Sequence, residues 1–198
     1  MEPFKRSVIK YKIDDEKVVF DDFYSVMQAQ VTYDTFTGNK ISTKRLAFER
    51  GDSVAIVLYE KETKSILLTK QFRYPSCKHN EGWLVEIPAG SLDDNESPED
   101  CICREVMEEL GYKIKSPTPI GTFYTSPGAC TERIFLFFSE VSLLDKLEEG
   151  GGNSSENEDI QLVKIPVLEL KQKIYGLKDA KTILGLQWFL LEKSGKNS

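Results

Sequence analysis

One stretch of the sequence decides how the middle of this chain folds: Gly90-Ser-Leu-Asp-Asp-Asn-Glu96-Ser97-Pro98-Glu-Asp-Cys-Ile-Cys-Arg104-Glu105-Val-Met-Glu108-Glu109-Leu-Gly111-Tyr112. From Ser97 the apolar residues recur with a helical period, which predicts one helix ending at Leu110. Ser97 can cap the free N–H groups at its start, and Pro98 suits the first helical position because its missing N–H would be unpaired there. Gly111 stands where a left-handed residue often ends a helix.

Three glutamates share one face of this helix. With Glu105 set as the origin, a rotation of about 100° per residue puts Glu109 at about 40° and Glu108 at about 300°, and the apolar residues fall on the opposite face, which we expect to face the core. Like charges at this spacing repel, and Arg104 offsets only part of the repulsion. Mg²⁺ would resolve it, since it takes carboxylate oxygens together with substrate phosphates. Taken alone, three glutamates are more typical of a solvated helix face.

The spacing around these acids is more specific than the acids themselves. Gly90, five residues, Glu96, seven residues and then Arg104 to Tyr112 resemble the Nudix box, Gly-x5-Glu-x7-Arg-Glu-U-x-Glu-Glu-x-Gly-U, where U is aliphatic, with all seven fixed positions present. At about 1 in 15 per fixed position, chance agreement is roughly 10⁻⁸ per window, so coincidence is negligible. The departure is Tyr112, which replaces an aliphatic residue and affects no expected ligand.

The resemblance runs from about Phe23 to Leu191 and points to one branch of the family. Further segments are similar to the ADP-ribose pyrophosphatase branch: Gln71-Phe-Arg73, Glu86-Ile-Pro-Ala-Gly90, Thr125-Ser-Pro-Gly-Ala-Cys-Thr-Glu-Arg133, Glu156-Asn-Glu-Asp-Ile160 and Asp179-Ala-Lys-Thr182. The glycines at 150–152 are also similar to GDP-mannose and UDP-sugar pyrophosphatases, which share most of these motifs. The resemblance implies an α/β (α+β) fold, a Nudix-type α/β/α sandwich with a mixed sheet, preceded by an N-terminal antiparallel strand region.

We predict the remaining strands and helices from the spacing of apolar residues and from turn and helix-cap residues. Strands are predicted at Phe23–Tyr33 and Ile41–Phe48 around the turn Thr37-Gly38-Asn39, at Ser53–Tyr59, Ser65–Phe72 and Trp83–Ile87, and after the helix at Ile120–Thr125 and Arg133–Val141. Helices are predicted at Val167–Tyr175 and Ala180–Lys193, the second with Asp179 as N-cap. We divide the chain into an N-terminal strand region, 1–50, expected to serve dimerisation, and a Nudix hydrolase domain, 51–198.

Composition excludes several classes of protein. The chain has 198 residues, 40% of them hydrophobic, and 26 basic against 32 acidic residues, which argues against a general nucleic-acid binder. His79 is the single histidine, so a His-rich metal site is excluded, and the four cysteines form no CxxC pair. The N-terminus lacks the apolar segment of a signal peptide, and no apolar run approaches the roughly 18 residues of a membrane span. We therefore expect a cytoplasmic protein with reduced thiols and neither a nucleic-acid nor a membrane partner.

The resemblance also implies a chemistry, the hydrolysis of a nucleoside diphosphate linked to a second moiety. It assigns Mg²⁺, with Mn²⁺ as the alternative, to Glu105, Glu108, Glu109 and Glu158 and to the Ala89 carbonyl, with Arg104 orienting a glutamate. In this branch a glutamate from a late loop deprotonates the water, and Glu156 and Glu158 are the candidates. The whole loop, 148–159, is polar and glycine-rich, so we expect it to be mobile without ligand.

Substrate contacts are expected from both halves of the chain. Gly90 lets the backbone turn tightly beside the phosphates, and Arg73 can clamp a diphosphate bidentately, although it can equally be a surface arginine. Glu132 either contacts substrate or pairs with Arg133 or Lys70. The other expected substrate-binding residues are Ser91, Lys181 and, from the second subunit of a homodimer, Phe23, Lys44 and Arg45, which can also be ordinary strand-packing or surface residues.

Three functions of different kinds remain open. We expect an enzyme, a Nudix pyrophosphatase that converts a nucleoside diphosphate sugar, foremost ADP-ribose to AMP and ribose 5-phosphate, with GDP-mannose or a UDP-sugar as the alternative substrate. A non-catalytic regulatory module that binds a nucleotide sugar would be marked by loss of a box glutamate or of the loop acids, and none is lost. Decapping of mRNA or nucleotide sanitation is disfavoured by the Pro127 segment, the long N-terminal strand region and the absence of a basic stripe.

Overall fold

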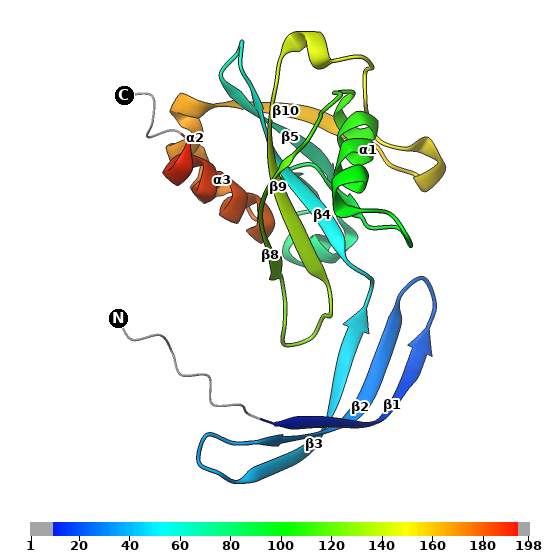
Figure 1. Cartoon of the computed structure of the whole chain (residues 1–198). Coiled ribbons are helices and arrows are strands. Elements are labelled where there is room, and N and C mark those ends of the chain that lie inside the picture. The colour runs from blue at the N-terminus through cyan, green and yellow to red at the C-terminus, as the bar shows by residue number, and fades with distance from the viewer. Residues whose placement is uncertain (1–9, 194–198) are drawn as a thin grey trace. The chain divides into compact units, whose positions relative to one another are not determined.

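The computed structural model describes residues 10–193, and the chain divides into two compact units (Figure 1). The first unit comprises the chain up to Gly51 together with Ser126–Glu132, and the second comprises Asp52–Thr125 and the chain from Arg133 onward. Each unit has its own sheet. The segment around Pro127 therefore belongs to the same unit as the N-terminal strands.

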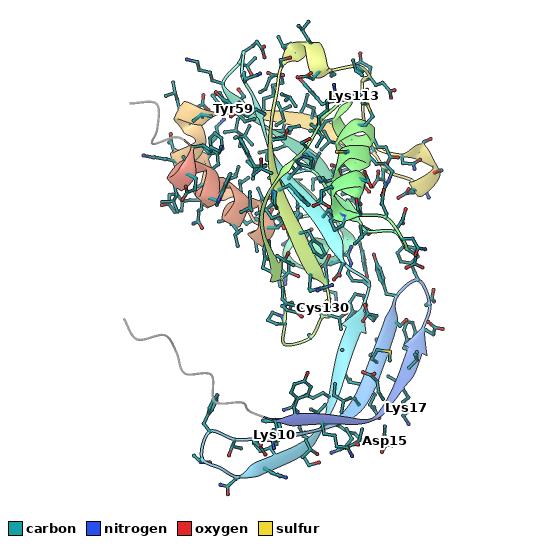
Figure 2. The ribbon with its side chains drawn as sticks, viewed as in Figure 1. Lys10, Asp15, Lys17, Tyr59, Lys113 and Cys130 are labelled. Carbon is teal, nitrogen blue, oxygen red and sulfur yellow. The ribbon has the colours of Figure 1, made fainter. Side chains whose placement is uncertain are left out.

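The first unit is a three-stranded antiparallel sheet in the order β1-β2-β3. Its strands are β1 (Tyr11–Asp21), β2 (Ser25–Asp34) and β3 (Lys40–Glu49). The β2–β3 hairpin was predicted. β1 was not predicted, because its polar sequence lacks the alternation of apolar and polar residues that marks a strand, and its pairing with β2 is irregular between Asp14 and Lys17. Within β1, β2 and β3, Ala29 is the one hydrophobic residue that is buried. Side chains such as those of Asp15 and Lys17 project from the sheet (Figure 2).

The second unit is built on a mixed sheet in the order β10-β5-β4-β9-β8, with β6 paired to β5 and β7 paired to β4. The strands are β4 (Ser53–Glu60), β5 (Ser65–Phe72), β6 (Trp83–Glu86), β7 (Ala89–Ser91), β8 (Thr118–Tyr124), β9 (Arg133–Val141) and β10 (Gln161–Pro166). β4 and β9 are parallel, and the other pairs are antiparallel. The predicted strands are all present, and β7 and β10 are additional.

Helices cover both faces of this sheet: α1 (Pro98–Leu110) on one side, α2 (Val167–Lys173) and α3 (Ala180–Glu192) on the other (Figure 1). Successive residues of a strand point to opposite faces, so Val54 and Ile56 pack with α1 while Ala55 and Val57 pack with α3. The expected α/β/α sandwich is confirmed. Short 3₁₀ turns complete the chain: η1 (Tyr74–His79), η2 (Leu143–Asp145), η3 (Ser154–Glu156) and η4 (Ile174–Gly176).

The ends of α1 form as its sequence predicts. The Ser97 hydroxyl accepts the N–H of Asp100 at 3.1 Å, and Gly111 adopts a left-handed φ of 72°. Tyr112 takes the place of an aliphatic residue without leaving its hydroxyl unpaired, because it donates to Glu60 Oε1 at 2.5 Å inside the core.

The four cysteines are free thiols. No helix among residues 10–193 is long and apolar enough to cross a membrane.

Candidate active site

The short strand β7 brings three expected site residues against α1. The Ala89 N–H donates to Glu109 Oε2 at 3.2 Å, and the Cys101 thiol donates to the Ser91 carbonyl at 3.3 Å. At Gly90 a Cβ atom would lie 1.9 Å from the Glu105 carboxyl carbon. Gly90 therefore leaves room for the Glu105 side chain, which would have to move if a larger residue stood there. Its expected place beside the phosphates stays a prediction.

Two of the three box glutamates on α1 are buried, contrary to a solvated acidic face, and the third, Glu108, is partly exposed. Glu105 is 8% exposed and Glu109 is 2% exposed, because β7 passes over them. Burial, with Glu108 and Glu158 nearby, raises the pKa of Glu105 to about 7 despite the neighbouring Arg104. Burial, followed by the charges of Glu105 and Glu158, raises the pKa of Glu109 well above its ordinary value. Buried carboxylates of like charge favour a bound cation, since a cation would offset both desolvation and repulsion.

Arg104 is the cation that meets these acids. Its Nε and Nη2 atoms donate to the two carboxylate oxygens of Glu96 at 3.1 and 3.0 Å, and Nη1 donates to Glu105 at 2.8 Å and to Glu108 at 3.3 Å. The bond to Glu96 raises the pKa of Arg104, so it stays charged. Arg104 thus contacts three glutamates of the box, and its role in orienting one of them stays a prediction.

The donor chemistry of this cluster fits a hard divalent cation. Its members are carboxylate oxygens of Glu105, Glu108 and Glu109, beside the backbone of Ala89, and Mg²⁺ prefers such oxygen ligands. Among residues 10–193, however, no three acidic, histidine or cysteine side chains converge into a finished metal site. Arg104 holds two of the glutamates instead, so metal binding would draw those carboxylates from Arg104.

The two loop acids lie in different surroundings. Glu158 Oε2 accepts the N–H of Asn153 at 2.9 Å, and its charge contributes to the raised pKa of both Glu105 and Glu109. Glu156 is exposed on η3, where Oε1 accepts a bond from the Asn153 side chain at 2.9 Å. Glu158 is thus the loop acid that interacts with the acids of α1.

Arg73 and Lys181, two expected substrate contacts, meet on one buried carboxylate. Arg73 donates to both oxygens of Glu86, at 3.2 and 2.9 Å, and Lys181 Nζ donates to Glu86 Oε2 at 2.8 Å. Burial by itself would raise the pKa of Glu86, but the charges of Lys181 and Arg73 lower it to about 2. The positive charge of Arg73 also acts on Glu109.

Sequence reasoning missed Glu86 as a site residue. The available signal was its place: a charged residue in the apolar strand Trp83-Leu-Val-Glu86-Ile87, directly before Pro88. A charge there needs a partner, because an unpaired buried carboxylate is strongly unfavourable. Its partners come from the end of β5 and from α3, and the sequence pattern does not identify them.

The other expected substrate contacts belong to the first unit. Phe23 is 85% exposed between β1 and β2, and Lys44 and Arg45 are exposed on β3. Glu132 is buried and forms an ion pair with Arg50 at 3.3 Å, whereas Arg133 pairs with Asp52. Their part in substrate binding stays a prediction.

A pocket of about 550 Å³ opens beside the loop that carries Glu158. It is lined by Lys70, Trp83, Asp159, Ile160 and Gln161. None of the acids of α1 lines it, so the acid cluster, and not this pocket, is the candidate for the chemistry.

Known proteins resemble this chain in sequence and in fold. Residues 49–184 match the NUDIX domain. The chain is 36% identical over 178 residues to a GDP-mannose pyrophosphatase of Cronobacter sakazakii, covering 87% of this chain and 91% of the relative. It is 35% identical over 179 residues to a GDP-mannose pyrophosphatase of Shigella flexneri, again covering 87% and 91%. The crystal structure of an ADP compounds hydrolase shares the fold, with a TM-score of 0.71 and 16% identity over 95% of this chain and 96% of that chain. The box helix, the sandwich and these relatives together establish that the chain belongs to the Nudix hydrolase family, in the branch that includes the GDP-mannose pyrophosphatases.

Proposed function

We propose that this protein hydrolyses the diphosphate of a nucleoside diphosphate sugar, with Mg²⁺ as the preferred metal and Mn²⁺ as a substitute. The observation that carries the proposal is the buried cluster of Glu105 and Glu109 beneath β7, with Glu108 beside it. Such a cluster is unfavourable without a cation and is therefore suited to hold one.

The residues of the cluster have separate tasks in this mechanism. Glu105, Glu108, Glu109 and the Ala89 carbonyl would hold the metal. When bound, a divalent cation offsets the charge that develops on the diphosphate and lowers the pKa of a bound water. Water attacks one phosphorus, the bridging P–O bond breaks, and the products are a nucleoside monophosphate and a sugar phosphate.

In this proposal the two loop acids, Glu158 and Glu156, have different roles, one toward the metal and one toward the attacking water. Glu158 interacts electrostatically with Glu105 and Glu109, which supports a role as an additional metal ligand. Glu156 is exposed and free of α1, which suits a base that reaches the water when substrate binds. Arg104 keeps the box glutamates oriented through its bonds to Glu105 and Glu108.

Arg73 and Lys181 are the proposed contacts for the diphosphate. Both are anchored on Glu86, so their positive charges are held in place before substrate arrives. Arg73 lies close enough to Glu109 for the two charges to affect each other's pKa, which supports a diphosphate that would contact the guanidinium beside the acid cluster. Gly90 and Ser91, on β7, would contact the same phosphates.

GDP-mannose is the first substrate to test, because relatives with 35–36% identity are GDP-mannose pyrophosphatases. ADP-ribose, expected from the segment around Pro127, is the second, and UDP-sugars are the third. We further propose a homodimer in which the exposed residues Phe23, Lys44 and Arg45 of one subunit complete the base and sugar site of the other. The contribution of Glu132 to that site and the cytoplasmic location stay predictions.

The test is a kinetic comparison with a matched pair of variants. Purified protein with Mg²⁺ is assayed against GDP-mannose, ADP-ribose, UDP-glucose, a deoxynucleoside triphosphate and capped RNA, and kcat/KM should be highest for a nucleotide sugar. Glu105→Gln should lower it by orders of magnitude, whereas Glu99→Gln, exposed on the same helix, should not change it. Preference for the triphosphate or the capped RNA, or binding of a nucleotide sugar without turnover, would refute the proposal.

A further inference from the structure

The loop that carries Glu158 is bonded to the C-terminal end of α1, where helix carbonyls would otherwise lack partners. The Gly111 carbonyl accepts the N–H groups of Leu147 at 2.8 Å and Glu148 at 3.2 Å. The Gly151 N–H donates to the Glu109 carbonyl at 2.9 Å, and the Gly152 N–H donates to the Glu108 carbonyl at 3.0 Å. We had expected the whole loop to be mobile without ligand, and its first part is instead attached to the helix of the acid cluster.

The attachment needs glycine on both sides. A Cβ atom at Gly150, whose φ is 75°, would lie 2.6 Å from the Glu109 carbonyl oxygen and 2.7 Å from the Leu110 carbonyl carbon. A Cβ atom at Gly111 would lie 1.9 Å from the Glu148 carbonyl oxygen. These neighbours are backbone atoms, so they cannot move aside as a flexible side chain would. Glycine at both positions is therefore what allows the loop to lie this close to the end of α1.

Gly152 connects this attachment to Glu158. A Cβ atom at Gly152 would lie 2.7 Å from Glu158 Cβ and 2.9 Å from Glu158 Oε2, so the glutamate side chain rests on the glycine. The next residue, Asn153, donates its N–H to the same Oε2 atom at 2.9 Å, and the Ile160 N–H donates to the Gly151 carbonyl at 3.0 Å. The helix end, the glycines and Glu158 thus form one continuous set of contacts.

We propose that Gly150, Gly151 and Gly152 form a clasp that positions Glu158 against the acids of α1 before any ligand binds. The proposal rests on the proposed function, because it assigns Glu158 to the metal held by those acids. The glycines act only through Glu158 and are positioning residues. A segment that merely ended the helix would be complete with the N–H bonds from Gly151 and Gly152 to the helix carbonyls and would not need the Glu158 side chain to rest on Gly152.

Two alanine variants separate positioning from backbone strain. Gly151 has a φ of 112°, and a Cβ there meets nothing closer than the Ile160 carbonyl oxygen at 4.0 Å, so Gly151→Ala imposes strain and keeps the clasp. Gly152→Ala, at a φ of 89°, imposes similar strain and also displaces Glu158. Both retain the N–H groups that bond to α1.

Mn²⁺ binding to the full-length protein, measured by calorimetry without substrate, is the main readout. Gly152→Ala should weaken it by about tenfold or more, as is usual when a residue supporting a metal ligand is changed. Gly151→Ala should stay close to wild type. Adding Gly152→Ala to Glu158→Gln should cause little further loss, because the ligand is already removed. Hydrogen exchange of the metal-free wild type should show protected N–H groups at Gly151 and Gly152.

Equal Mn²⁺ affinity in the two alanine variants, or fast exchange at both N–H groups, would overturn the clasp. If Gly152→Ala does not fold while Gly151→Ala does, Gly152→Ala/Glu158→Gly removes the two Glu158 atoms nearest the added Cβ and leaves only Ile160 Cδ1 close to it, at 3.1 Å. This double variant should restore folding, and a failure to do so would contradict the contact. Binding of Mn²⁺ by a wild type that hydrolyses no nucleotide sugar would refute the proposed function and leave the clasp testable.

Discussion

The charge of Glu86 should stabilise the second unit in a pH-dependent way. Its carboxylate is 2% exposed and holds Arg73 and Lys181, and its pKa falls from 4.5 to about 2 on folding. A lowered pKa in the folded state adds stability above the unfolded pKa, and that stability is lost as the pH falls through the folded pKa. The relevant window therefore lies between pH 4.5 and about 2.

The size of the effect follows from the two pKa values. Their difference, 4.5 minus about 2, is about 2.5, which at about 1.36 kcal/mol per pKa unit gives about 3 kcal/mol at pH 7. By linkage, about 2 kcal/mol of this remains at pH 3.5. The stability gap between the wild type and Glu86→Gln should therefore narrow by about 1 kcal/mol between pH 7 and pH 3.5.

Urea unfolding followed by tryptophan fluorescence measures this gap. Both tryptophans, Trp83 and Trp188, lie in the second unit, so the signal reports on the unit that contains Glu86. Other carboxylates titrate in both proteins and cancel in the difference. The constant part of the gap contains the cost of leaving the buried Lys181 with Asp179, 3.1 Å away, as its remaining acidic partner. A gap that does not change from pH 7 to pH 3.5 would refute the assignment of a charged, ion-paired Glu86.

Further outcomes are expected from the acid cluster and the first unit. Glu109→Gln should reduce turnover by orders of magnitude and leave the melting temperature of metal-free protein equal or higher, because burial and the charges of Glu105 and Glu158 disfavour the charged form of this carboxyl and the amide carries no charge; a large loss of stability with normal turnover would contradict it. Glu156→Gln should lower kcat by about 10²–10⁴-fold at an unchanged Mg²⁺ requirement, and Glu158→Gln should raise that requirement; the reverse pattern in a Mg²⁺ titration would exchange the two roles. If neither mutant loses more than about threefold, the base must be sought elsewhere, first at Glu132. Analytical ultracentrifugation should show a dimer at micromolar concentration, and a fully active monomer would exclude shared sites.

The sequence alone determined α1 and the family. Helix ends depend on bonds within one turn, so Ser97 and Gly111 could be recognised as caps without knowledge of any other part of the chain. Strands with regular alternation, such as β4 and β5, were predicted for the same local reason. β1, β7 and β10 were missed because a polar, very short or loop-flanked strand is held by its pairing partner and not by its own pattern.

The tertiary structure decided which charges are buried and what they meet. The helical period placed Glu105, Glu108 and Glu109 together, but their burial depends on β7 crossing the helix at Ala89 and Gly90. The same applies to more distant partners. Glu86 meets Lys181 from 95 positions away, and the glycines at 150–152 bond to carbonyls of α1. Local sequence determines backbone conformation and the faces of a helix, whereas the environment of a charge is set by segments that only folding brings beside it.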